Sequence, residues 1–349
     1  RPGEAVPDGV RLAGGEETIR FAPEEGATLV KVFTTEGELS VTDSEILVGD
    51  QDSAEVDLEV TWTRGLEVTD EVGAVEGGRS TKYTRTYESL DHDVEFALEV
   101  LVDGQPEVQE SADTSGASEL AGEAVVFAWD EEAGSYRREF AEEGPDLALL
   151  DGLVEDLDLR FLLPAGEVEV GDSWEVRGDD LLGLVAPGGD VGLRIDSGLA
   201  AWEPVAAGIE PAFYSDLQAL LTPGGEGELS CTFTEVRESD GTRVAVIDIE
   251  VELSGGEDLS ELMQSRLAAI ADRVPGDLDV TQADVTFEID GDGELLWDLA
   301  GNHLAGLDLD LDVTIEVDRA VEVDTGAEAM EVITAVTFEG ELKQTVEVR

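Results

Sequence analysis

Apolar and polar residues alternate along much of this chain. The clearest run places Leu307, Leu309, Leu311, Val313, Ile315 and Val317 between Asp308, Asp310, Asp312, Thr314, Glu316 and Asp318. Alternation with a period of two is typical of an antiparallel strand that buries one face and exposes the other. At about 3.3 Å per residue this run spans roughly 40 Å, about twice the usual strand length. The pattern predicts a tall, curved sheet with an apolar inner face and an acidic outer face.

The same alternation predicts further strands elsewhere in the chain. They cover residues 29–34, 55–62, 245–253, 332–338 and 342–348. Two Asp-Gly sequences, at residues 239–241 and 290–293, are typical of hairpin turns because Asp-Gly tolerates positive φ. The small, polar segment 112–123 is predicted to be a loop.

Helical patterns are scarce. Residues 258–273 predict one helix, with Leu262, Met263 and Ile270 on a common apolar stripe and Asp258 or Ser260 as its N-cap. Weaker patterns predict helices at 211–221 and 147–157. The expected fold is therefore mainly β (α+β), with long, curved antiparallel sheets around an apolar interior and one or two packed helices.

The chain divides into three predicted parts. Residues 1–24 form a flexible leader rich in Pro and Gly, residues 25–160 an N-terminal β-rich half, and residues 161–349 a C-terminal β-rich half with the helix near 258–273. The sequence Glu-Gly-Glu-Leu-Ser occurs at 36–40 and again at 226–230. Two duplicated halves are one interpretation, and shared strand-initiating turn chemistry is the other.

Charge excludes several classes of partner. The 349 residues include 84 Asp and Glu against 20 Lys and Arg, giving a formal net charge of −64. Such a chain repels nucleic acids and anionic membrane surfaces. Hydrophobic residues nevertheless make up 42% of the chain, which predicts a packed core rather than a disordered acidic polymer. Lysine occurs only at Lys31, Lys82 and Lys343, a bias that suits either a halophilic, salty setting or a GC-rich genome.

Candidate catalytic residues are few. Cys231 is the single cysteine, and it alternates in phase with Leu229 and Phe233, so we expect a buried, unreactive thiol. His92 and His303 are the two histidines, and we expect both to lie in exposed loops or turns. Two separated histidines make neither a zinc site nor a catalytic triad, and we find no phosphate-binding or hydrolase motif. We therefore expect a protein that is not an enzyme.

One acidic stretch has the oxygen-rich spacing of a calcium loop. Asp290, Asp292 and Glu294 would supply alternating carboxylates. However, Leu295 stands where an EF-hand loop requires Gly, and Gly301 stands where it requires Glu. The segment is interpreted as a hairpin turn, with weak Ca²⁺ binding as the alternative and no other cofactor expected.

Residues 163–174 read Leu-Pro-Ala-Gly-Glu-Val-Glu-Val-Gly-Asp-Ser-Trp. Val168 and Val170 would share a face, Gly171 and Asp172 would turn the chain, and Trp174 would pack into the core. This stretch resembles a motif in a family of uncharacterised bacterial envelope proteins, often lipoproteins, for which no catalytic residues are known. More loosely, the pattern of long strands is similar to curved-sheet lipoprotein carriers that hold acyl chains.

The resemblance implies an extracytoplasmic location, periplasmic or secreted, with a lipid anchor before truncation as one possibility. The start at Arg1 rather than Met agrees with removal of a precursor segment. We expect a non-catalytic envelope or secreted protein that carries an apolar or lipid ligand, with Leu262, Met263 and Ile270 lining the cavity. The alternative is a structural or adhesive surface module that binds cations or protein partners, whose identity the sequence does not give.

The excess of carboxylates predicts that salt stabilises the fold. The melting temperature should rise between about 10 mM and 1 M NaCl, because the Debye length falls from about 30 Å to about 3 Å and screens repulsion among like charges. Thermal unfolding followed by circular dichroism measures this, and a flat response would mean that the carboxylates are already well spaced or paired.

Overall fold

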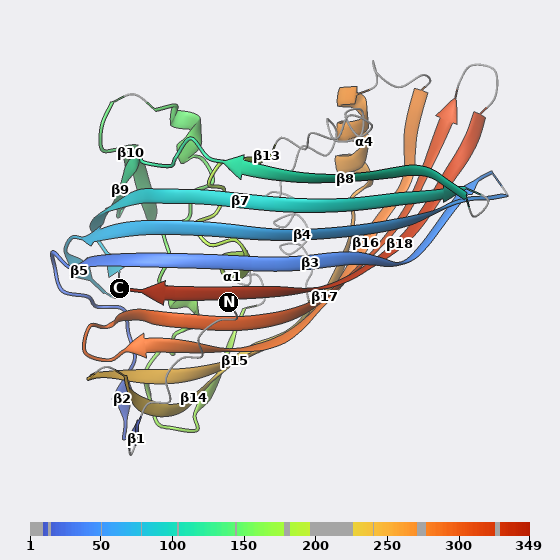
Figure 1. The fold of residues 1–349 in the computed structure, drawn as a ribbon. Coiled ribbons are helices and arrows are strands. Elements are labelled where there is room, and N and C mark those ends of the chain that lie inside the picture. Colours follow the sequence, from blue (N-terminus) through green and yellow to red (C-terminus); the bar gives the residue numbers. More distant parts are fainter. Residues whose placement is uncertain are drawn as a thin grey trace.

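The computed structural model describes one dominant antiparallel sheet. Description covers residues 10–12, 15–49, 51–77, 79–102, 105–143, 145–177, 182–195, 226–239, 241–270, 277–324 and 329–349. Nine long strands build the sheet: β3 (Thr28–Val48), β4 (Gln51–Val72), β7 (Lys82–Val102), β8 (Gln105–Ala117), β14 (Glu226–Ser239), β15 (Thr242–Asp258), β16 (Asp277–Asp298), β17 (His303–Asp324) and β18 (Ala329–Val348). The sheet curves strongly, and β16, β17 and β18 sweep round behind β3, β4 and β7 (Figure 1). The mainly β fold class is confirmed.

The long strands follow the chain order from β14 to β18 and from β3 to β8, and these two runs meet at a seam between β18 and β3. The path runs β1-β14-β15-β16-β17-β18-β3-β4-β7-β8-β13, where β1 is Val10–Leu12 and β13 is Arg194–Ile195. Neighbouring strands along this path are antiparallel, and the C-terminal strand β18 pairs with β3 over most of its length. Strands from both predicted halves therefore form a single continuous sheet. Ser239 at the end of β14 pairs with Thr242 at the start of β15, which agrees with the hairpin predicted there, although Asp240 lies outside the described residues.

The inner and outer faces follow the alternation. On β17, Leu309 is 0% and Leu311 3% exposed, whereas Asp308, Asp310 and Asp312 are exposed. Val313 is only half-buried. Cys231 is fully buried on β14, and burial raises the pKa of its thiol to about 12, which agrees with the inert thiol expected.

The predicted hairpin at residues 290–293 is wrong. These residues lie in the middle of β16 and pair with β15 on one side and β17 on the other. A Cβ at Gly291 would lie 2.7 Å from Cδ2 of Leu311 and 2.2 Å from the carbonyl oxygen of Asp310. The glycines therefore provide close approach between strands, which is the other common reason for glycine within a sheet.

Two further element predictions need correction. Residues 112–117 belong to strand β8 rather than to a loop, because small polar residues are tolerated on a strand near the sheet edge. The helix predicted at 147–157 is only a short 3₁₀ turn, η1 (Leu147–Leu150). Helix α4 (Ser260–Ile270) confirms the main predicted helix, and the Asp258 carboxylate accepts a hydrogen bond from the Ser260 amide at 2.9 Å. The predicted helix at 211–221 lies outside the described residues.

A largely irregular segment crosses the inner face of the sheet. This covering segment, residues 145–177 and 182–195, contains η1, η2 (Arg160–Leu162), α1 (Leu182–Val185), β11 (Glu167–Val168), β12 (Ser173–Val176) and β13. Its leucines at 150, 153, 157, 159, 162 and 184 join the main core. The Trp174 indole donates to the Leu162 carbonyl at 3.0 Å, and Gly171 turns the chain with φ 101°, as the motif predicted. Val168 is buried but Val170 is 44% exposed, so the two valines do not share a buried face.

Part of the predicted leader belongs to the core. Strand β2 (Glu17–Thr18) pairs with β11, and Ile19 and Phe21 are 2% and 6% exposed. Short strands β5 (Val75–Glu76), β6 (Arg79–Ser80), β9 (Ala124–Asp130) and β10 (Ser135–Phe140) complete the sheets. Among the helices described, none has the length and apolar character needed to cross a membrane.

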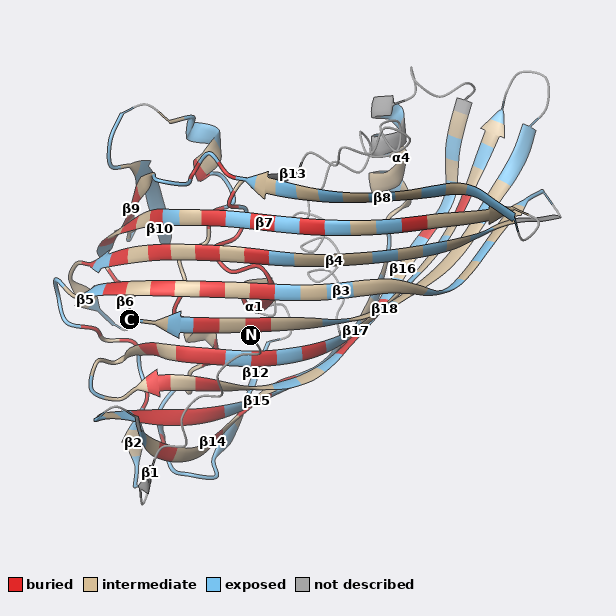
Figure 2. Ribbon diagram, viewed as in Figure 1, coloured by how far each residue is buried: buried red, intermediate tan, exposed pale blue. Residues whose placement is uncertain are grey.

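The covering segment protects only part of the inner face. Figure 2 shows buried positions at one end of β3 and β4 giving way to half-buried and exposed positions toward the other end. On β7 the change is weaker, because Val94 and Leu98 are still buried at 4% and 7% exposure. We call the covered end, which includes residues 29–35 of β3 and 64–72 of β4, the near part. The far part comprises residues 54–62 of β4, 94–102 of β7, 313–323 of β17 and 330–342 of β18. The long sheet thus has one packed and one partly open inner surface.

Leu309 and Asp312 test the assignment of the two faces on β17. Leu309→Ala should lower the free energy of unfolding by about 2–5 kcal/mol, because it removes a fully buried side chain and leaves a cavity. Asp312→Ala on the outer face should change it by less than about 0.5 kcal/mol. Urea unfolding of both variants measures this, and equal effects would contradict the assignment.

Candidate functional site

A row of buried polar side chains crosses the inner face where the near part ends. Gln344 of β18 pairs with Thr35 of β3, Thr35 with Arg64 of β4, and Arg64 with His92 of β7. Their exposed fractions are 1%, 4%, 6% and 8%, respectively. We call these four residues the border row, since Leu66 on its covered side is 1% exposed and Trp62 on its other side is half-buried.

Two nitrogens of the border row have no hydrogen-bond partner among the described residues. Thr35 donates to the Gln344 side-chain oxygen at 2.5 Å, so that end of the row is satisfied internally. Nη2 of Arg64 donates to the Pro187 carbonyl at 3.3 Å, which ties the covering segment to β4. Nε of Arg64 and Nδ1 of His92 are buried and unpaired. Buried polar atoms are normally satisfied, so these two call for an explanation.

Electrostatics keep one of these side chains charged and favour neutrality in the other. Burial lowers the pKa of Arg64 to about 10, while the Asp190 carboxylate acts in the opposite direction, so the guanidinium is charged at neutral pH. Burial and the positive charge of Arg64 lower the pKa of His92, against a weaker opposing effect of Asp93. His92 is thus a buried residue, and the expectation of an exposed loop is wrong because Asp91 and Asp93 point to the opposite face of the strand.

His303 shows no comparable arrangement. It follows a turn at residues 299–302 and begins β17, where its Nδ1 lies 2.6 Å from the Leu304 carbonyl oxygen. The two histidines lie on separate strands, β7 and β17, and form no joint site.

Beyond the border row the inner face becomes apolar. Trp62 packs over the backbone of Gly37, where an added Cβ would lie 2.1 Å from the indole ring. Half-buried apolar side chains then continue along the far part: Val56, Leu58, Val60, Phe96, Val100, Val313, Ile315, Val317, Val332, Val336, Phe338 and Leu342. The polar row therefore meets a long apolar surface.

A separate ion network anchors the covering segment in the near part. The Lys31 ammonium lies 2.9 Å from Asp70 and 2.8 Å from Asp158 of the covering segment. Arg85 donates to both Asp70 oxygens at 2.8 and 2.9 Å, and also to the carbonyls of Val154 and Glu155. Lys31, Asp70 and Arg85 are each 3% exposed or less. Lys31 and Arg85 therefore have carboxylate partners within the protein.

The network sets the ionisation of its members. Burial alone would raise the pKa of Asp70, but Arg85 and Lys31 outweigh it and hold that pKa at about 2. Burial alone would lower the pKa of Lys31, but Asp158 and Asp70 raise it overall. Asp70 and Lys31 therefore both stay charged across the neutral range.

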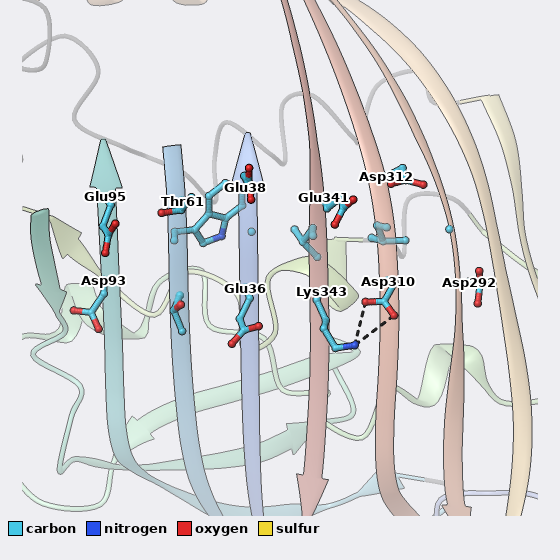
Figure 3. A pocket seen from close by; sticks show the side chains of 16 residues that line it. Glu36, Glu38, Thr61, Asp93, Glu95, Asp292, Asp310, Asp312, Glu341 and Lys343 are labelled. Atoms are coloured by element: carbon cyan, nitrogen blue, oxygen red, sulfur yellow. Dashed lines mark hydrogen bonds and ion pairs between the residues drawn. The ribbon is translucent and has the colours of Figure 1, made fainter. Parts of the chain in front are cut away.

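The outer face carries an acidic groove of about 620 Å³ over β7, β4, β3, β18, β17 and β16. Figure 3 shows carboxylates from these neighbouring strands, with the Lys343 ammonium 3.2 Å from Asp310. The groove is lined by Glu36, Glu38, Asp93, Glu95, Asp292, Asp310, Asp312 and Glu341, with Lys343 as its cation. Such a surface attracts cations through its summed field.

The predicted calcium ligands lie on this outer face without forming a loop. Asp290, Asp292 and Glu294 follow one another along the outer face of β16 at every second position. Glu294 accepts two hydrogen bonds from Arg237, at 2.8 and 2.7 Å. Within the described part of the chain, no group of three His, Cys, Asp or Glu is arranged to hold a metal ion.

The predicted ligand-binding residues on α4 are only partly described. Leu262 and Met263 are half-buried, and the side chain of Ile270 lies outside the described residues. The helix packs against β16, where Gln264 bonds to the backbone of Leu278 and Val280. Their role in ligand binding stays a prediction.

Sequence reasoning missed the border row. Its signal is a polar residue at a position where the alternation requires an apolar one, as with Arg64 between Trp62 and Leu66. His92, between Leu90 and Val94, repeats this on the adjacent strand. Only the strand register shows that the exceptions align.

Removing Lys31 should strongly destabilise the protein. Lys31→Met should lower the free energy of unfolding by about 3–5 kcal/mol, because it leaves buried Asp158 without its cation. Lys82→Met is the matched control, since Lys82 is exposed on β7 and should cost less than about 0.5 kcal/mol. Chemical denaturation compares the two, and similar values would contradict an anchoring role for the network.

No protein-family model matches the chain, and no curated protein matches it. Among solved structures, it is similar to an outer membrane channel from Pseudomonas putida F1, with 11% identity, coverage of 94% of this chain and 97% of that chain, and a TM-score of 0.20. It is also similar to the outer membrane protease OmpT from Escherichia coli, with 7% identity, coverage of 94% and 98%, and a TM-score of 0.16. These TM-scores are too low to carry an argument about fold or function.

Proposed function

We propose that this protein is a non-catalytic binding protein that holds an apolar ligand against the inner face of the far part. The observation that supports this is the mismatch between the long apolar inner face and the shorter covering segment. Val56, Leu58 and Val60 continue the inner face of β4, yet they are only half-buried. Each side chain moved fully out of water would contribute up to about 1.5–3 kcal/mol, so an apolar ligand has a driving force to bind there.

The near part is not the proposed site. Its inner face is filled by leucines of the covering segment, and Leu153, Leu157 and Leu162 are 0% exposed. The ligand would instead lie beyond the border row, next to the packed core. The sequence suggested one large apolar cavity, and we now place the ligand in the far part alone.

An extracytoplasmic location belongs to the same proposal. Its support is the resemblance of residues 163–174 to bacterial envelope proteins, which the sequence alone suggested. The acidic outer face fits a carrier that stays away from anionic membrane surfaces and nucleic acids, because its field repels both.

The alternative is a structural or adhesive module that binds cations or protein partners. The acidic groove on the outer face favours it, since carboxylates from neighbouring strands line that groove. The two functions use opposite faces of the same sheet and can therefore be separated by experiment.

Binding of a neutral, environment-sensitive apolar dye tests the proposal. The wild type should enhance the dye's fluorescence, and Leu58→Glu should weaken binding at least about tenfold, because it places a charge on the apolar face. Glu59→Gln is the matched control on the outer face and should bind as the wild type does.

Two outcomes would reject the apolar-ligand proposal. One is no dye binding by folded wild type, and the other is equal binding by Leu58→Glu. A melting temperature raised by Ca²⁺ well beyond the effect of NaCl at equal ionic strength, without dye binding, would favour the cation-binding alternative instead.

A further inference from the structure

We propose that the border row binds the anionic head of the ligand, and that the ligand is a single-chain fatty acid whose tail follows the inner face of the far part. This inference rests on the proposed function and names its ligand class. Arg64 and His92 would contact the carboxylate, and the apolar side chains beyond Trp62 would contact the acyl chain.

Two buried, unpaired nitrogens of the border row indicate that the head group is anionic. Arg64 is 6% and His92 8% exposed, and they face each other across adjacent strands in direct register. Nε of Arg64 and Nδ1 of His92 lack partners among the described residues. A guanidinium beside an imidazole supplies donors that suit a carboxylate, and bonds from an ionised donor to an ionised acceptor are the strong ones.

The other buried cations of the near part are already occupied. Lys31 is paired with Asp70 and Asp158, and Arg85 is paired with Asp70, so the charges of both cations are already neutralised within the fold. Arg64 by contrast makes one hydrogen bond among the described residues, to the uncharged Pro187 carbonyl. The acidic group that acts on Arg64 is Asp190, which is exposed and whose Oδ1 accepts from the Gly192 amide.

Position along the strands fits an amphiphile. On β4 the border row lies where full burial ends, and the inner face continues from Arg64 through Trp62, Val60 and Leu58 to Val56. That path measures about 26 Å at about 3.3 Å per residue, long enough for an extended acyl chain. Arg64 lies at one end of the apolar path, as a head-group anchor must.

Among the described residues, an arginine on the inner face of the far part could compete for the same head group. Arg319 of β17 lies two positions beyond Val317 and is half-buried at the opposite end of the far part. Its Nη2 lies 3.5 Å from the Thr334 hydroxyl, and burial lowers its pKa. This arginine provides a matched control with the same charge on the same face.

The experiment compares a fatty acid with the fatty alcohol of equal chain length, each displacing the neutral dye at mildly alkaline pH. The wild type should bind the acid at least about tenfold more tightly than the alcohol, the effect expected of one charge-assisted contact. Arg64→Gln should bind both about equally, whereas Arg319→Gln should keep the wild-type preference. Circular dichroism confirms that each variant is folded.

The outcomes separate this inference from the proposed function. Equal binding of acid and alcohol by the wild type overturns the head-group site while leaving an apolar carrier intact. Binding of neither ligand nor dye overturns the proposed function and the inference with it. Loss of the preference in Arg319→Gln but not in Arg64→Gln overturns the assignment to the border row. If Arg64→Gln does not fold, the ratio of the wild type's affinities for acid and alcohol still tests whether the site binds an anionic head group.

Discussion

The structure depends on one constraint, that a sheet with an apolar face must cover that face. Strands of 20 to 22 residues, such as β18 and β4, present an apolar surface far longer than ordinary strands do. The covering segment packs leucines against the near part and is fixed there by the buried network of Lys31, Asp70, Arg85 and Asp158. The far part keeps the same apolar pattern with less cover, and this difference is the basis of the proposed function.

Charge is sorted by face as strictly as hydrophobicity is. Apart from buried Asp70, the carboxylates of the long strands lie mostly at outer positions, where water and salt reduce their mutual repulsion. Three of the few basic residues, Lys31, Arg64 and Arg85, are instead buried on the inner face. Two of them neutralise buried carboxylates. Arg64 has no carboxylate in contact within the described part of the chain, which is unusual in a chain with a net charge of −64.

The period-two pattern was sufficient to predict the fold class and the faces of β17, and the helical stripe with its N-cap was sufficient to place α4. It could not separate a glycine in a turn from a glycine inside a strand, because both allow close backbone approach, and so residues 290–293 were misassigned. Nor could it reveal the border row, since the alignment of Thr35, Arg64, His92 and Gln344 depends on register across strands distant in sequence. The covering segment was equally hidden, because its mostly irregular backbone has no period to detect.

The seam between β18 and β3 has a consequence for how the chain is made. Thr35 and Gln344, which are 309 positions apart, meet across it. Neighbouring hairpins can form locally, but this pairing must wait until the last strand has been synthesised, and such distant contacts slow folding. Until then β3 is an unpaired edge on which another nascent chain could add a strand. Its alternating acidic residues, Glu36 and Glu38 among them, would repel an equally acidic second copy, so the negative charge would also oppose aggregation while the chain is being made.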